Sequence, residues 1–417
     1  MTVPSEAPDP VADWARSGVV PLTGRPDGPP LVPPGRAATL ARELGDRFAA
    51  ATAGTAHPVR VDGTQLLSER AAFTGHRRRG AVSAGGSCRL LPTADGWAAV
   101  SCARPDDWPL LGALVGAELP SDPWPAVAQW LRDHGSTELG ARAELLGVAA
   151  GPVLAPPAAP PSPSPGPARG VAGLLVVDFS ALWAGPLCAH LLGLAGARVV
   201  KVETPDRPDG ARRGNPAFYR LLHAGHRSVV LDPATPRGRR ALADLVAAAD
   251  IVIEASRPRA LAGFGLDARA TVDAGAVWIS ITAGGRASNR VGFGDDVAAA
   301  SGLVAWDARG TPVFCGDALA DPLTGLVAAD RALSARPGDL VDIAMSAVVG
   351  STVDTGDADT RDAVSAAARD ENGTWVVDTA SGPVPVADPR RRPAHGSAPE
   401  SGEHTREVLR AYGIPLP

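Results

Sequence analysis

The chain has few cysteines, few aromatic residues and no long apolar run, and each shortage excludes a class of protein. Its four cysteines are scattered and form no CxxC pair, which argues against zinc and against a disulfide framework and favours a reducing, cytoplasmic compartment. Aromatic residues make up only 4% of the sequence and interleave with no basic tract, so nucleic-acid binding is not indicated. No apolar stretch reaches the length of about 18 residues that suggests a membrane span. No basic segment followed by an apolar one opens the chain, so we expect a soluble protein.

Length and charge set the scale of the fold without naming a partner. The 417 residues can hold two or three domains, and 45% of them are apolar, enough for a substantial core. The net charge of −5 is too small to indicate a partner of opposite sign.

The clearest fold signal lies between residues 174 and 203. An apolar strand at 174–179 leads through the small-residue turn Trp183–Pro186 into a helical run, and a second strand follows at 198–203. Short apolar strands recur at 228–232, 251–254 and 277–281, with a helical pattern at 241–249 between two of them. This alternation predicts an α/β fold with a Rossmann-like, doubly wound parallel sheet and a smaller α+β domain. Ligands bind outside the carboxyl ends of such strands.

Two breaks divide the chain. The stretch PVLAPPAAPPSPSPGP at 152–167 is too rich in proline for helix or sheet and predicts an extended linker. An Asp-rich, aperiodic stretch at 355–373 predicts a loop or disorder. The resulting domain prediction is a partial repeat at 1–78, a small α+β domain at 79–151, a linker at 152–170, a large α/β domain at 171–350, a loop at 351–374 and a closing segment at 375–417 that returns to the large domain.

The chain contains a weak internal repeat. Similar short segments follow one another in the same order in both halves, at 17–20, 25–30, 59–62 and 73–75 and again at 301–304, 309–312, 340–343 and 354–356. Matching Gly35 to Gly316 places Leu40 opposite Asp321, so one copy has an aliphatic residue where the other has a carboxylate. Chance similarity between loops rich in glycine and proline is the alternative.

Several segments together resemble the class III CoA-transferases, the family of formyl-CoA and carnitine CoA-transferases. They are VVDFSALWAGPLCAHLLGLAGARVVKVETP from Val176, PDGARR at 208–213, HAGHRSVVLD at 223–232, ADIVIEASRP at 249–258, and GEHT at 402–405. The order of parts differs from the family pattern, because a segment similar to the family's small domain lies at 83–153, ahead of the catalytic half. Family members are interlocked homodimers, so a homodimer and a single-chain pseudo-dimer are both open here.

The resemblance implies that Asp321 is a nucleophile. In the family, an aspartate attacks the thioester of an acyl-CoA to give a mixed anhydride, and CoA then forms an aspartyl thioester from which an acceptor carboxylic acid takes it over. CoA is then a substrate, and no tightly bound cofactor or metal is needed. Taken alone, an aspartate after Ala-Leu-Ala reads as a helix cap, and one residue can serve in both ways.

The same resemblance places CoA against a set of loops. Arg257 and Arg259 suit the phosphates because guanidinium binds phosphate with two parallel hydrogen bonds, although a solvated loop edge explains them equally well. Gly85 and Gly86 resemble a glycine flap over the reacting aspartate, or form a plain turn. The complete set of expected CoA contacts is Trp183, Ala184, Arg212, Leu231, Asp232, Ala255, Ser256, Arg257, Arg259 and Asp295.

Other functions compete with CoA transfer. A nicotinamide oxidoreductase requires GxGxxG after the first strand, and this fingerprint is absent. An acyl-CoA racemase of the same fold uses a histidine in a GHD triplet, where this chain has Gly294-Asp295-Asp296. The main alternative is a catalytically degenerate homologue that serves as a CoA-binding or partner subunit.

Overall fold

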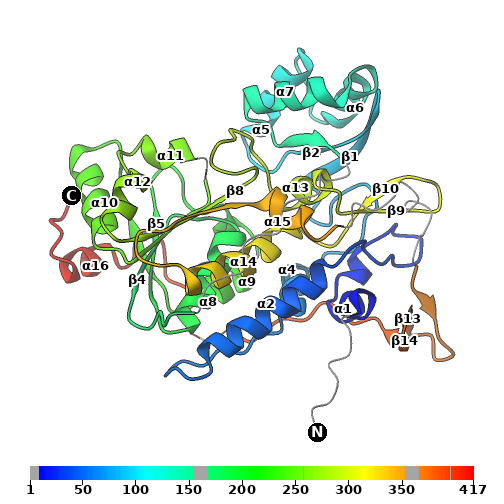
Figure 1. Cartoon of the computed structure of the whole chain (residues 1–417). Coiled ribbons are helices and arrows are strands. Elements are labelled where there is room, and N and C mark those ends of the chain that lie inside the picture. The colour runs from blue at the N-terminus through cyan, green and yellow to red at the C-terminus, as the bar shows by residue number, and fades with distance from the viewer. Residues whose placement is uncertain (1–8, 154–167, 257, 354–365, 395) are drawn as a thin grey trace, which may run out of the picture.

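The computed structural model describes residues 9–153, 168–256, 258–353, 366–394 and 396–417. A six-stranded sheet lies at its centre, and every neighbouring pair in this sheet is parallel (Figure 1). The spatial order is β11-β8-β7-β4-β5-β6. The strands are β4 (Leu175–Asp178), β5 (Arg198–Glu203), β6 (Arg227–Val230), β7 (Ile251–Glu254), β8 (Val277–Thr282) and β11 (Leu340–Ala344). The predicted α/β class and parallel sheet are confirmed.

The order of the strands reverses at β4. From β4 the chain builds outward through β5 and β6 on one side, and through β7, β8 and β11 on the other. Such a reversal leaves a crevice at the carboxyl ends of the two strand groups, which is where open α/β sheets bind ligands.

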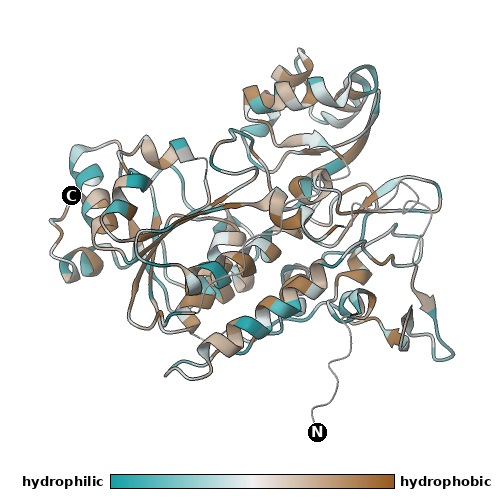
Figure 2. Cartoon of the chain, in the orientation of Figure 1, coloured by the Kyte–Doolittle hydropathy of each residue, from teal (hydrophilic) through white to brown (hydrophobic). Residues whose placement is uncertain are grey.

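The central strands β4, β7 and β8 are mostly apolar because helices cover both faces of the sheet. Successive side chains point to opposite faces, so Val176 enters one core and its neighbours Leu175 and Val177 enter another. Figure 2 shows the resulting concentration of hydrophobic residues along the central strands. The first face is covered mainly by α8 (Ala184–Leu194), α9 (Pro216–His223) and α14 (Ala320–Ser334), and the second by α10 (Pro236–Ala247), α12 (Ala268–Asp273) and α16 (Thr405–Ala411).

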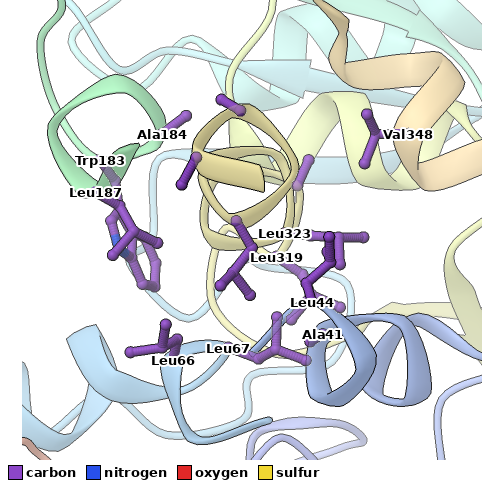
Figure 3. Packing of buried hydrophobic residues seen from close by; sticks show 14 of the residues in the cluster. Ala41, Leu44, Leu66, Leu67, Trp183, Ala184, Leu187, Leu319, Leu323 and Val348 are labelled. Carbon is purple, nitrogen blue, oxygen red and sulfur yellow. The ribbon is translucent and has the colours of Figure 1, made fainter. Parts of the chain in front are cut away.

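The N-terminal segment, residues 9–80, shares the core of the large sheet. Its described part consists of the long helix α2 (Ala37–Thr52) and the shorter elements α1 (Pro10–Arg16), η1 (Val20–Leu22), α3 (Gly63–Leu66) and α4 (Glu69–Thr74). Helix α2 packs along α14, and Leu44, Leu66 and Leu67 meet Leu319 and Leu323 in one hydrophobic cluster (Figure 3). The N-terminal segment is therefore held against the start of α14 by buried apolar surface, which stabilises by roughly 25 cal/mol per Å².

A small sheet with its own core lies at one end of the molecule (Figure 1). Strands β1 (Cys88–Thr93), β2 (Gly96–Ser101) and β3 (Ala150–Pro152) are antiparallel and carry α5 (Asp107–Val115), α6 (Trp124–Asp133) and α7 (Ser136–Leu146). Hydrogen bonds join it to the large domain: Ser101 Oγ donates to Asp296 Oδ1 over 3.0 Å, and the backbone N–H of Asn289 donates to Glu144 over 3.1 Å.

The closing segment, residues 375–417, packs against two separate parts of the molecule. Helix α16 packs beside β6, whereas β13 (Trp375–Thr379) and β14 (Gly382–Pro385) pack near α1. A short strand, β12 (Ala368–Arg369), pairs with β13 within the stretch that the sequence predicted as a loop. Most of the predicted proline-rich linker, 154–167, and the first part of the predicted loop, 354–365, lie outside the described residues. The remaining elements are η2 (Gly210–Arg213), α11 (Pro258–Ala262), α13 (Gly294–Ala300), β9 (Val304–Trp306), β10 (Pro312–Phe314) and α15 (Met345–Gly350).

Candidate active site

A cavity of about 230 Å³ lies at the carboxyl edge of the large sheet, where the strand order reverses. Its walls come from the segments after β4, β5, β7, β8 and β11, from the loop ahead of α13 and from the first turn of α14. The small domain contributes Arg104 to the wall. The cavity therefore lies at the place that the fold favours for a ligand.

Asp321 lines this cavity from the second position of α14. The N-cap of the helix is Leu319, so the prediction that Asp321 caps the helix is wrong, although its carboxylate still lies near the positive end of a 15-residue helix. A Cβ built on Gly294 would lie 2.6 Å from Asp321 Oδ2 and 2.4 Å from the carbonyl oxygen of Ala318. Glycine at 294 thus leaves the room that the carboxylate occupies.

The loop ahead of α14 has an unusual backbone. Gly316 has a φ of +69°, which suits glycine, but Ala318 also has a positive φ, of 50°. A non-glycine residue in this conformation is uncommon and must be held by its surroundings. Asp295 Oδ1 accepts the backbone N–H of Ala318 over 2.8 Å, and the carbonyl oxygen of Ala318 accepts the N–H of Asp321 over 2.9 Å. Asp295, expected to contact CoA, therefore fixes the loop that leads into the helix.

The N-terminal segment supplies a guanidinium to this loop. Arg70, on α4, donates from Nε to Asp317 Oδ2 over 2.9 Å and from Nη2 to Asp317 Oδ1 over 2.5 Å. His76 Nδ1 lies 3.2 Å from the same Oδ2. Gly85, from the predicted glycine flap, lies beside His76, since a Cβ built on Gly85 would lie 3.6 Å from His76 Cε1. Residues far apart in sequence thus converge one turn ahead of Asp321.

Four buried carboxyl groups lie around the start of α14, and their surroundings shift their pKa values in different directions. Burial raises the pKa of Asp321 to about 7; the charge of Arg70 opposes this rise and the neighbouring carboxylates add to it. Burial also raises the pKa values of Asp295 and Asp296 to about 6. Burial works in the same direction on Asp317, but the charge and hydrogen bonds of Arg70 outweigh it and the pKa of Asp317 lies well below its ordinary value. A single fixed anion, Asp317, therefore lies among groups that gain or lose protons near neutral pH.

Only some of the expected CoA contacts lie at the cavity. Ala184, Ala255 and Ser256 line it, as expected from their places after β4 and β7. Trp183 does not, because its ring is buried edge-on against Phe218.

The other expected contacts lie elsewhere or serve local structure. Arg212 donates to both carboxylate oxygens of Glu203, so its charge is already neutralised. Leu231 is buried in the core of the opposite sheet face. Asp232 closes a turn by accepting the N–H of Ala234. Arg259 is exposed on α11 and does not line the cavity. Arg257 lies outside the described residues.

Sequence reasoning missed three arginines that line the cavity, namely Arg104, Arg207 and Arg290. Arg104 pairs with Asp107 and stacks over the ring of Phe293. Arg207 is exposed after β5, and Arg290 lies in the loop ahead of α13. No local motif marks them: Arg207 and Arg290 come from separate loops of the large domain, and Arg104 reaches the cavity from the small domain.

Comparison with known proteins assigns the chain to a family. The profile of CoA-transferase family III matches residues 171–405, more than half of the chain. A succinate–glutarate CoA-transferase of Agrobacterium fabrum is 31% identical over 176 residues, which cover 37% of this chain and 44% of that protein. A succinyl-CoA–L-malate CoA-transferase beta subunit of Chloroflexus aurantiacus is 34% identical over 171 residues, covering 37% and 42%. The human succinyl-CoA:glutarate CoA-transferase is 30% identical over 175 residues, covering 38% and 40%.

The matches to these relatives are partial. The chain spans less than half the length of each of these three curated relatives. Among solved structures, a hypothetical protein of Mycobacterium tuberculosis superposes with a TM-score of 0.41 at 29% identity, covering 44% of this chain and 57% of that one. With the family profile matched across the large domain and the closing segment, the chain belongs to CoA-transferase family III.

Proposed function

We propose that the protein transfers CoA from an acyl-CoA thioester to a carboxylic acid, with Asp321 as the nucleophile. One observation carries this proposal: a carboxylate lines the cavity at the strand reversal, at the positive end of a helix, in a chain of CoA-transferase family III. The names of two relatives describe CoA transfer between succinyl-CoA and malate or glutarate, and they support the same reaction class.

The proposed reaction proceeds through two covalent forms of Asp321. An oxygen of its carboxylate attacks the thioester carbonyl, the carbon–sulfur bond breaks and CoA leaves as a thiolate, which gives a mixed anhydride. The thiolate then attacks the aspartyl carbonyl and the donor acid leaves as a carboxylate. The acceptor carboxylate attacks the aspartyl thioester and releases the thiolate, which gives a second mixed anhydride. The thiolate finally attacks the acceptor's acyl carbonyl in this anhydride, and the carboxylate of Asp321 leaves.

The surrounding residues suit these steps. Only the ionised carboxylate is a nucleophile, and the charge of Arg70 favours that form over the protonated one. The N-terminus of α14 stabilises negative charge on the oxygens that lose and regain it during the exchange. Arg70 reaches the loop through Asp317, so we assign it a positioning role.

The chain's own arrangement favours one site in a single-chain pseudo-dimer. Helix α2, which carries Leu40, packs along α14, which carries Asp321, and the two regions share one core. In this interpretation the N-terminal segment is a second, degenerate copy of the region around α14, and it has kept the structural contacts while losing the nucleophile.

We place the protein in the cytoplasm, in keeping with its free cysteines. Within the described residues, no helix is long and apolar enough to cross a membrane.

An exchange assay tests the proposal. Wild type and the variants Asp321→Asn and Asp321→Ala are incubated with a panel of acyl-CoA donors and carboxylic acids, and new CoA esters are measured by mass spectrometry. We expect exchange by the wild type and a loss of at least about 10³-fold in both variants, since Asp321 is the one carboxylate among the described residues that line the cavity. CoA binding without exchange by the wild type would support the partner-subunit alternative, and exchange by Asp321→Ala would refute the assignment of the nucleophile.

A further inference from the structure

Two residues other than glycine have a left-handed backbone within the part of the chain that the structure describes, and both lead into helices of the active site. Leu182 has a φ of 69° and Ala318 a φ of 50°. Each directly precedes the N-cap of a helix whose first turn lines the cavity, α8 for Leu182 and α14 for Ala318. Residues held in this conformation cluster at functional sites. Ala318 leads into the proposed nucleophile, whereas the proposed chemistry alone requires no strained residue at 182.

Leu182 places an apolar side chain in the wall of the cavity. It lines the cavity together with Ala181 and Ala184, and 41% of it is exposed. Glycine would adopt the same backbone without strain, so the turn itself does not require a leucine. In a left-handed residue the side chain leaves the backbone in a different direction than in a helix or a strand. The conformation of Leu182 therefore determines where its side chain lies in the wall.

The buried carboxylate of Asp209 holds this conformation. Its Oδ1 accepts the backbone N–H of Leu182 over 3.0 Å, and its Oδ2 lies 2.9 Å from Lys201 Nζ. Burial acts to raise the pKa of Asp209, but the charge of Lys201 and the hydrogen bonds outweigh it, and this pKa lies below its ordinary value. The next residue, Gly210, leaves room for the leucine, since a Cβ built on it would lie 3.2 Å from Leu182 Cδ2. Asp209 and Gly210 thus fix both the backbone and the side chain of Leu182.

We propose that Asp209 is a positioning residue of the active site, which holds Leu182 in its left-handed conformation and so keeps the leucine side chain in the wall that acyl-CoA contacts. This inference rests on the proposed function and extends it to a residue that does not itself line the cavity. It also gives the PDGARR segment a role other than the phosphate contact expected of Arg212, whose charge Glu203 neutralises.

The competing interpretation is that Asp209 only balances the buried ammonium of Lys201. Replacing Asp209 with asparagine or with alanine would then have the same effect, because both changes remove the charge. If Asp209 acts through Leu182, the two replacements differ. Asparagine keeps a side-chain oxygen that accepts the N–H of Leu182, and alanine does not.

Calorimetric titration with CoA distinguishes these interpretations. It is performed on wild type, Asp209→Asn, Asp209→Ala, Leu182→Gly and the double variant Leu182→Gly/Asp209→Ala. Leu194→Ala is the matched control, because Leu194 lies at the other end of α8 and is 37% exposed. Near-ultraviolet circular dichroism checks that each variant is folded. If an Asp209 variant does not fold, both replacements are repeated together with Lys201→Met, which removes the ammonium that would be left unpaired.

We expect Leu182→Gly and Asp209→Ala each to weaken CoA binding about tenfold, as the loss of one apolar side-chain contact provides. The double variant should bind CoA no more weakly than either single variant, because both changes act through the same side chain. Asp209→Asn and Leu194→Ala should bind CoA as wild type does. A loss of about a hundredfold in the double variant, equal losses in Asp209→Asn and Asp209→Ala, or unchanged binding by Leu182→Gly would each overturn the inference.

The CoA-exchange assay separates this inference from the proposed function. If the titrations agree with the expectation but wild type exchanges no CoA, the proposed function fails while the positioning role of Asp209 stands. If wild type exchanges CoA and the two losses are additive, the inference alone fails. A wild type that neither binds nor exchanges CoA overturns both.

Discussion

Replacing Arg70 with methionine should destabilise the protein and also raise the pKa of the proposed nucleophile, Asp321. Arg70 makes two short hydrogen bonds to Asp317, whose side chain is fully buried, while 25% of the Arg70 side chain is exposed. Removing one partner of a buried pair costs about 3–5 kcal/mol because the other charge is left uncompensated. The partial exposure of Arg70 favours the lower limit, so we expect a loss of about 3 kcal/mol.

Arg47→Met is the matched control. Arg47 also makes two hydrogen bonds to an aspartate, Asp330, between the N-terminal segment and α14. Its side chain is 45% exposed, so we expect a loss of about 1 kcal/mol or less. Urea unfolding at pH 7.5 measures both changes. Equal losses of unfolding free energy in the two variants would refute the claim that burial makes the Arg70–Asp317 pair contribute more than the Arg47–Asp330 pair.

The pH profile supplies a second measurement on the same variant. Arg70 holds down the pKa of Asp321, which burial has raised to about 7. Removing the guanidinium should move the rise of kcat/KM with pH above 7, since a higher pH is then needed to ionise the nucleophile. The profile of Arg47→Met should match that of wild type. An unmoved midpoint in Arg70→Met would contradict the electrostatic role of this arginine.

Three further changes test the site and its support. The folded-state pKa of Asp321 is raised, so wild type should lose stability relative to Asp321→Asn as pH rises from about 4 to 8, by up to about 4 kcal/mol in urea titrations; a difference independent of pH would contradict this. Gly294→Ala should destabilise by about 1–3 kcal/mol and lower exchange, because the added methyl group meets the Asp321 carboxylate; wild-type activity would exclude this packing. Lys201→Met should cost about 3–5 kcal/mol, because the buried ammonium lies 2.9 Å from Asp209 and 3.8 Å from Asp178; a stable variant would show that its charge is dispensable.

The strands of the predicted doubly wound sheet followed from the sequence because their signals are local, whereas the order β11-β8-β7-β4-β5-β6 comes from the structure. Continuous apolar segments such as 251–254 and 277–281 are typical of parallel strands, and the structure places β7 and β8 there. The predicted strand at 228–232 is displaced to 227–230, although the backbone N–H of Leu231 still donates to Glu203 of β5 over 3.1 Å. Boundaries depend on tertiary pairing, which periodicity does not contain.

The site was only partly predictable for the same reason. Ala184 and Ser256 lie in the segments that follow β4 and β7, so the rule for strand ends placed them at the cavity. Arg212 looked like a phosphate ligand from its charge, but a carboxylate nine residues earlier, Glu203, takes that charge up. Arg70 and Arg290 reach the site through contacts between distant segments, and neither lies in a motif.

Trapping the covalent intermediate is the most direct test of the central claim. The protein is incubated with an acyl-CoA donor, treated with borohydride and digested, and the peptide that contains residue 321 is analysed by mass spectrometry. Reduction of an aspartyl thioester converts that residue to homoserine, and the account predicts this change at Asp321 only when an acyl-CoA is present. CoA exchange with an unmodified Asp321, or trapping at another carboxylate, would contradict it.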